Sequence, residues 1–259
     1  MYYGAMRAIP DSVVMLDRDL REIFGARLQS LVAYGVRAEQ RTHDDDHGHG
    51  GGQHVERPLA HTMAIANTLT AGDLRACAGR AAAWHDAGLA TPLLLAANEF
   101  ERSLDAFPLE FGAIVADHVV VSGRNPFDGA SVDPADVRRA CEVQARSHLL
   151  HLREGYIEAR GNGDALAVLI VQSAAPFAAL LTAVARLQRD RDAGGSMTGD
   201  AETAGRQVER LLDTPGRAIT DVVKVAGVTE ISAAEAARMF PAYLEAVERL
   251  VTFVDGWTR

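Results

Sequence analysis

The sequence predicts an α+β protein, in which a small mixed-sheet α/β domain (residues 1–130) precedes an all-α helical bundle domain (residues 131–259). Before residue 126, short apolar runs that end near glycine alternate with segments of helical periodicity, which is typical of strands joined to helices. From Asp133-Pro134 onward the helical period is almost uninterrupted. It predicts helices over about 134–160, 164–188, 200–213, 216–226 and 233–255.

Local signals predict the elements of the first domain in order. An apolar stripe of helical period follows the capping oxygens of Asp11 and Ser12 and predicts the first helix. The string Thr70-Ala-Gly-Asp73 resembles a capping box, which opens a helix running to about Ala87. Apolar runs predict four strands, over residues 28–35, 59–69, 91–96 and 118–122.

The stretch after the third strand predicts two short helices. Asn98 is expected to cap the first of them, and Pro108 to begin the second, since proline suits the first helical position. Phe107 is expected in the core and Asp105 is a candidate cap. Asp105 and Glu110 also invite an interpretation as an acid pair, but we favour the architectural one.

Composition limits the function classes. The chain has 259 residues, 48% of them hydrophobic and 24% charged, which is enough to bury a core. Its 26 basic and 35 acidic residues give a formal net charge of −9. This balance argues against a nonspecific nucleic-acid binder, which needs a basic surface to displace counterions from phosphates.

The sequence also bears on the compartment. Cys77 and Cys141 are isolated, which argues against a disulfide framework or a cysteine-based zinc site. Residues 1–11 show no readable secretory signal, so the cytoplasm is the expected location. Residues 165–185 carry no charge over a length that could cross a bilayer. Their alanine content and the central Pro176 favour a buried bundle helix, kinked or broken near the proline, and no membrane partner.

Three stretches carry a resemblance to a known family. The first is the helix, strand and turn of residues 20–35, the second joins residues 91–95 to residues 101–111, and the third is residues 148–156. Together they resemble the polymerase-beta-like nucleotidyltransferase domain proteins of bacteria that carry a helical C-terminal domain. The resemblance covers residues 13–190 and implies the fold of that family.

The resemblance also implies which residues the family reaction needs. Two aspartates separated by one residue place both carboxylates on one face of a strand, and a third carboxylate completes a two-metal site. A Gly-Ser turn binds the triphosphate. Here Gly35 is followed by Val36, and alignment of the apolar strand places Ala60 and Thr62 at the carboxylate positions. We therefore assign no catalytic residue and expect a protein that lacks transferase activity and keeps a binding or regulatory cleft.

Residues 39–57 predict a flexible loop and leave two other functions open. Asp44 and Asp46 have the i, i+2 spacing of a carboxylate pair, so the chain could be an active nucleotidyltransferase that uses Mg or Mn. Alternatively, imidazole and carboxylate groups could bind Zn or Ni in a metal-binding or sensor protein. The candidate metal ligands are His43, Asp44, Asp46, His47, His49 and His54.

Several residues are candidates for binding a nucleotide or another anionic small molecule, which is the expected partner. They are Gly35, Arg37, His61, Arg146 and Arg153. Arg146 and Arg153 lie seven residues apart on one helix face, where they could share an anion. His148 and His151 also share a helix face, but the flanking leucines favour an ordinary amphipathic helix over a metal pair. The helical domain is a candidate for homo-oligomerisation.

Overall fold

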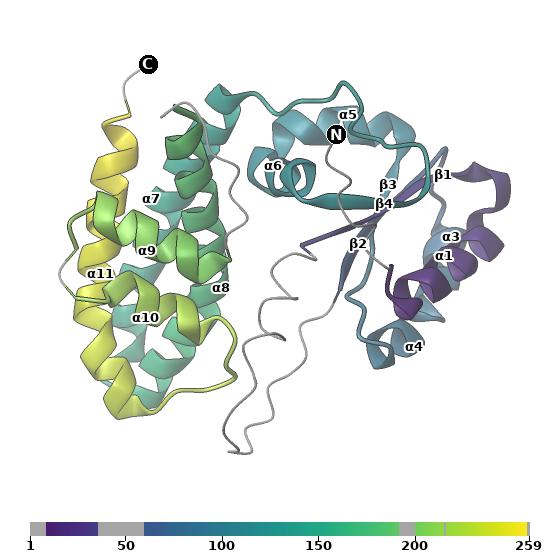
Figure 1. Cartoon of the computed structure of the whole chain (residues 1–259). Coiled ribbons are helices and arrows are strands. Elements are labelled where there is room, and N and C mark those ends of the chain that lie inside the picture. The colour runs from purple at the N-terminus through teal and green to yellow at the C-terminus, as the bar shows by residue number, and fades with distance from the viewer. Residues whose placement is uncertain (1–8, 36–59, 192–199, 215, 258–259) are drawn as a thin grey trace. The chain divides into compact units, whose positions relative to one another are not determined.

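The computed structural model describes residues 9–35, 60–191, 200–214 and 216–257 (Figure 1). The chain divides into two compact units, with the boundary between Val132 and Asp133. The first unit holds a four-stranded mixed sheet with helices, and the second is built of helices alone. This arrangement confirms the predicted α+β class.

The sheet has the strand order β3-β2-β1-β4. Strand β1 is antiparallel to β2 and β4, whereas β2 and β3 are parallel. Each strand lies within or close to a predicted apolar run, with bounds β1 Leu28–Tyr34, β2 His61–Ala66, β3 Leu93–Ala96 and β4 His118–Gly123. The mixture of directions follows from the connections, because parallel strands need a crossover and β3 is reached through two helices.

Helices cover both faces of this sheet (Figure 1). On one face lie α1 (Asp11–Phe24), α3 (Ala71–Ala78) and α4 (Ala81–Asp86), and on the other lie α5 (Ala97–Ala106) and α6 (Pro108–Ala116). A 3₁₀ turn, Gly25–Arg27, joins α1 to β1. Because side chains alternate along a strand, successive residues of β1 and β2 enter two separate cores. The first core includes Leu16, Leu20, Leu31, Ala64 and Trp84, and the second includes Val32, Met63, Ile65, Phe100 and Phe111.

The capping box predicted at Thr70 is present. Thr70 Oγ1 accepts from the Asp73 backbone N–H at 3.2 Å, and Asp73 Oδ2 accepts from the Thr70 N–H at 2.9 Å. Arg27 donates two further hydrogen bonds to the Asp73 carboxylate, at 2.8 and 2.7 Å, and thereby holds α3 against the start of β1. The single helix expected here is instead two helices, because the chain turns at Gly79.

Three local expectations after β3 are wrong. The residue preceding α5 is Ala96, whose N–H donates to the Glu99 carboxylate, so Asn98 is inside the helix and does not cap it. Asp105 likewise lies inside α5. Phe107 is 56% exposed, because it occupies the turn that precedes α6. Pro108 begins α6, as predicted.

The helical unit contains α7 (Pro134–Ala159), α8 (Gly163–Arg191), α9 (Ala201–Leu211), α10 (Ala218–Val225) and α11 (Ala233–Asp255). Helix α8 packs against the other four. Its fully buried side chains, Ile170, Ala174, Phe177, Leu181 and Val184, supply much of the core. Helix α8 continues through Pro176 without a break, since packing fixes the residues that follow the proline.

Within the described part of the chain, α8 is long and apolar enough to span a membrane by length and composition. The span covers Gly163–Arg189, with a mean hydropathy of 2.0 over its most apolar window. Half of that window is buried inside the protein. This burial supports the interpretation of α8 as a core helix of the bundle.

Candidate functional site

The candidate site implied by the nucleotidyltransferase resemblance lies at one end of the sheet, where β1 ends and β2 begins. In the antiparallel register, Tyr34 pairs with His61 on β2 and with His118 on β4. Gly35 follows at φ 71°, a conformation that glycine adopts readily, and its N–H donates to the Asp117 carbonyl at 3.4 Å. The sheet therefore places three rings in a row beside this glycine.

The Tyr34 and His61 rings are stacked, with centroids 5.6 Å apart and an interplanar angle of 27°. Tyr34 is half-buried, and burial raises the pKa of its hydroxyl, so Tyr34 is neutral at physiological pH. His61 is exposed. Tyr34 was not among the site residues predicted from the sequence. The signal that could have identified it is an aromatic residue at the last position of a predicted strand, directly before a glycine.

His118, at the other side of the row, is held by its surroundings. Its Nδ1 lies 3.0 Å from the Ile114 carbonyl oxygen, and its Nε2 lies 3.2 Å from Asn125 Oδ1. His118 thereby fixes the beginning of β4 to the end of α6 and to the loop that follows β4.

The two positions aligned with the family's aspartates belong to the other face of the sheet. Ala60 bridges to Leu89 and belongs to the core under α1, α3 and α4. Thr62 pairs with Ala33 and is 1% exposed, and its Oγ1 has no hydrogen-bond partner among the described residues. By alternation Thr62 shares the face of Ala60 and Ala64. A carboxylate at either position would be surrounded by apolar side chains.

The four strands contain no acidic residue. Their sequences are Leu-Gln-Ser-Leu-Val-Ala-Tyr, His-Thr-Met-Ala-Ile-Ala, Leu-Leu-Leu-Ala and His-Val-Val-Val-Ser-Gly. Nor does any group of three or more His, Cys, Asp or Glu side chains suited to a metal ion occur in the described part of the chain. Two Mg²⁺ ions need oxygen ligands with negative charge. The strands therefore do not fit the metal pair that the family implies.

Some predicted site residues lie outside the described residues. They are Val36, Arg37, His43, Asp44, Asp46, His47, His49 and His54. The metal-dependent alternatives that rest on Asp44, Asp46 and the four histidines of this segment stay predictions. Among the nucleotide-binding candidates, Gly35 and His61 lie together at the sheet end.

Arg146 and Arg153 belong to the helical unit, and each pairs with a carboxylate of α11. Arg146 Nη2 lies 2.7 Å from Asp255 Oδ2, and Arg153 Nη2 lies 2.7 Å from Glu248 Oε1. Both guanidinium groups are about half exposed. An anion shared by the two arginines would have to compete with these carboxylates, and their role in anion binding stays a prediction.

The two histidines of α7 separate into different environments. His148 is buried and its Nε2 lies 2.6 Å from Tyr243 Oη, whereas His151 is exposed and lies 3.3 Å from Ser147 Oγ. Desolvation, with a smaller contribution from His151, lowers the pKa of His148 to about 4. His148 is therefore a neutral core residue at physiological pH, in line with the amphipathic interpretation.

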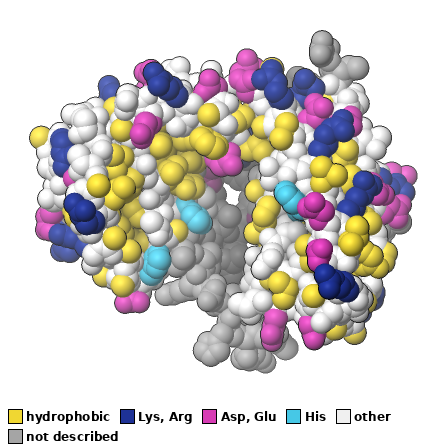
Figure 2. All heavy atoms as spheres, turned by 180° about the vertical axis from the view of Figure 1, so that it is seen from behind, with side chains coloured by type: hydrophobic (Ala, Val, Ile, Leu, Met, Phe, Trp, Pro, Cys, Tyr) yellow, Lys and Arg dark blue, Asp and Glu magenta, His cyan; other side chains and the backbone are white. Residues whose placement is uncertain are grey.

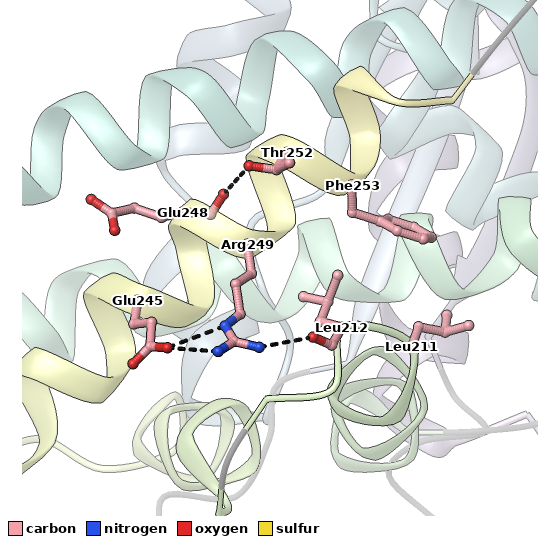
Figure 3. A pocket seen from close by; sticks show the side chains of 7 residues that line it. All are labelled: Leu211, Leu212, Glu245, Glu248, Arg249, Thr252 and Phe253. Atoms are coloured by element: carbon pink, nitrogen blue, oxygen red, sulfur yellow. Dashed lines mark hydrogen bonds and ion pairs between the residues drawn. The ribbon is translucent and has the colours of Figure 1, made fainter.

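A groove of about 510 Å³ opens in the helical unit between the end of α9 and α11 (Figure 3). Arg249 donates to Glu245 Oε1 through Nε and Nη2, and to the Leu212 and Asp213 carbonyl oxygens through Nη1. Glu248 is the partner of Arg153. The charged groups of this groove are thus engaged in joining α11 to its neighbours.

Charges of both signs are interspersed on the face of the molecule in Figure 2. That face shows no continuous basic area of the kind that binds the phosphates of nucleic acid. This pattern agrees with the net charge of −9.

The comparisons with known proteins support the fold. No family model and no curated protein match the chain. Among solved structures, the spectinomycin adenyltransferase AAD(9) from Enterococcus faecialis, solved with ATP and spectinomycin, is similar with a TM-score of 0.53. It is 10% identical in sequence, and the match covers 93% of this chain and 98% of that one. This similarity confirms the predicted nucleotidyltransferase-like fold with a helical C-terminal domain.

Proposed function

We propose that this chain is a nucleotidyltransferase-like protein without transferase activity, which binds a nucleotide or another small anionic molecule at the sheet end beside Gly35. The observation that carries the proposal is the absence of any Asp or Glu from the four described strands. Binding itself is supported by the shared fold, since the similar adenyltransferase was solved with ATP.

The energetics favour binding over transfer. A metal-bound triphosphate develops charge during transfer, and anionic ligands must hold the metal ions that compensate it. The described strand ends offer the Tyr34–His61 ring pair, and one acidic residue, Asp117, lies beside them immediately before β4. Such groups can stack on a base and hydrogen-bond to a ligand without fixing two cations.

The experiment measures transfer and binding separately. Release of pyrophosphate is followed with each of the four nucleoside triphosphates, with Mg²⁺ or Mn²⁺, and with spectinomycin present or absent. We expect no release above the rate without protein. Metal-dependent release that disappears in the Asp44→Ala, Asp46→Ala double variant would instead establish the active alternative.

Binding is followed by the melting temperature, because a ligand that binds only the folded state raises it. We expect ATP to raise the melting temperature equally with and without Mg²⁺. His61→Ala should reduce this rise, whereas His85→Ala, an exposed histidine of α4 that hydrogen-bonds Thr91, should leave it unchanged. A rise that requires Mg²⁺ would contradict a metal-free site.

The metal-sensor alternative has its own test. Calorimetry with Zn²⁺ and Ni²⁺ compares the full chain with a variant that lacks residues 43–54. Stoichiometric binding that is lost with the deletion would assign a metal site to this segment. If both proteins behave alike, the segment is not a metal site.

A further inference from the structure

A second groove in the helical unit, of about 410 Å³, lies between α10, α11 and the connection that joins them. Its apolar lining consists of Val225, Val228, Ile231 and Met239. Its charged lining consists of Asp221, Lys224, Glu230, Glu235 and Arg238. The volume is in the range that small ligands occupy in proteins.

The charged groups of this groove differ from those of the α9–α11 groove. Lys224 and Arg238 form no ion pair or hydrogen bond with any described residue, and the Asp221 and Glu230 side chains form none either. Glu235 uses only its backbone N–H, which donates to Ser232 Oγ. The α9–α11 groove, by contrast, has its arginine and both of its carboxylates engaged. The α10–α11 groove therefore keeps its charged groups available to a ligand.

The order of acidic and basic residues along the two helices indicates which charges a ligand of this groove should carry. Each wall carries an acidic and a basic residue three positions apart, Asp221 and Lys224 on α10, and Glu235 and Arg238 on α11. Residues at i and i+3 are separated by about 4.5 Å along a helix. A molecule that satisfies both signs must have an ammonium and a carboxylate a similar distance apart. An extended dipeptide spans at most about 7 Å between its ends, which is longer than this rise along the helix, and the long flexible side chains of Lys224 and Arg238 can cover the difference.

We propose that the α10–α11 groove binds a short apolar peptide of about two residues. The peptide ammonium lies toward Asp221, Glu230 and Glu235, and its carboxylate lies toward Lys224 and Arg238. Its side chains cover Val225, Val228, Ile231 and Met239. A purely anionic ligand fits less well, since three carboxylates and two cations line the groove.

Lys224 provides a selective probe, because it is the sole lysine of the chain. Reductive methylation with ¹³C-formaldehyde keeps its positive charge and labels only Lys224 and the amino terminus of the chain. The peptide Leu-Leu is titrated against the labelled full-length protein. We expect a saturable chemical-shift change of the Lys224 methyl signal and none at the amino terminus.

Matched peptides and variants make the test specific. Acetyl-Leu-Leu lacks the ammonium and Leu-Leu-amide lacks the carboxylate, and each should bind at least about tenfold more weakly, since each loses charge-assisted hydrogen bonds. Arg238→Gln should weaken Leu-Leu binding by a similar factor. Arg210→Gln, an exposed arginine of α9 outside the groove, should not change it.

Two outcomes would overturn the proposal. One is the absence of a saturable change at Lys224 when Leu-Leu is in large excess and the melting temperature shows that the labelled protein is folded. The other is equal binding of Leu-Leu, acetyl-Leu-Leu and Leu-Leu-amide, which would mean that the groove recognises only apolar side chains. Neither outcome depends on nucleotide binding at the sheet end.

Discussion

The two units stabilise their buried polar groups by different chemistry. In the α/β unit, Asp19 accepts from Trp84 Nε1 at 3.0 Å and pairs with Arg80, and Asp73 pairs with Arg27. The hydrogen bonds from Arg27 hold the pKa of Asp73 well below its ordinary value. In the helical unit, the buried His148 joins Tyr243 and Ser173 through hydrogen bonds of 2.6 and 3.1 Å without a charged partner, and the only carboxylate bonded to a buried polar side chain among the described residues is Glu209, which accepts from Thr220 Oγ1 at 2.7 Å.

In the α/β unit, the buried acidic residues lie on helices and not on strands. Asp19 joins α1 to Trp84 of α4 and to Arg80, and Asp73 joins α3 to Arg27, just before β1. The strands themselves are neutral. Charged groups of this unit therefore join its helices to one another and to the start of β1, and the four described strands contribute no acidic side chain to its packing.

The largest expected effect is at Trp84, which joins α4 to Asp19. Trp84 is 1% exposed, so Trp84→Ala removes a large buried side chain and also a donor to a buried carboxylate. We expect a loss of about 4 kcal/mol in the free energy of unfolding of the α/β unit. Hydrogen exchange of the β1 and β2 amides measures this loss within the unit.

Trp84→Phe separates the two contributions. It keeps most of the apolar volume and removes the hydrogen bond to Asp19, so we expect a smaller loss of about 1–2 kcal/mol. If alanine and phenylalanine cost the same, the hydrogen bond would dominate and burial would contribute little. If phenylalanine costs nothing, Arg18 and Arg80 satisfy Asp19 without Trp84, and the contrast between the units is weaker than the structure indicates.

The pH dependence of the helical unit follows from His148. Its pKa is about 4 in the folded state, against 6.5 for an ordinary histidine. Between these pH values the unfolded chain binds a proton that the folded chain does not, so stability falls as the pH is lowered from 6.5 toward 4. We expect His148 to contribute a loss of about 3 kcal/mol over this window.

The measurement is urea unfolding at several pH values between 4 and 7.5, with His148→Gln as the control. Glutamine retains a donor for Tyr243 and does not titrate, so the difference between the two proteins isolates the histidine from the carboxylates. The difference should vanish above pH 7 apart from a constant offset. Parallel curves at all pH values would show that His148 is hydrated and titrates normally.

Much of the fold could be predicted because it is encoded locally. The capping box at Thr70, the proline at the start of α6 and the five helices of the second unit each depend on residues within a few positions of one another. The prediction that Phe107 lies in the core was wrong, because its burial depends on the direction of the turn before α6, and hydrophobic periodicity does not report that direction.

Contacts between distant residues could not be predicted in the same way. Arg27 meets Asp73 across 46 positions, and His148 meets Tyr243 across 95. Nothing in the local sequence distinguishes these partners from other charged or polar residues. At the candidate site, the absence of Asp and Glu from the four described strands could be predicted from residue types alone, whereas the burial of Thr62 needed the sheet register.

The smallest expected effect is at Thr62, and it tests the candidate site directly. Its hydroxyl is buried without a partner among the described residues, so Thr62→Val removes an unsatisfied polar group while preserving shape. We expect a gain of about 1 kcal/mol in the free energy of unfolding. Urea unfolding at pH 7 measures it, with Thr68→Val, at a position outside the strands, as the comparison.

Thr62→Asp reverses the test. A carboxylate here would enter an apolar core, so it should destabilise the unit by about 3 kcal/mol and should not create Mg²⁺-dependent pyrophosphate release. If the aspartate variant folds as well as the parent and gains stability from added Mg²⁺, its side chain must reach solvent beside Gly35. Position 62 would then be able to hold a metal ligand, and one substitution would be enough to give the strands the negative charge that they lack.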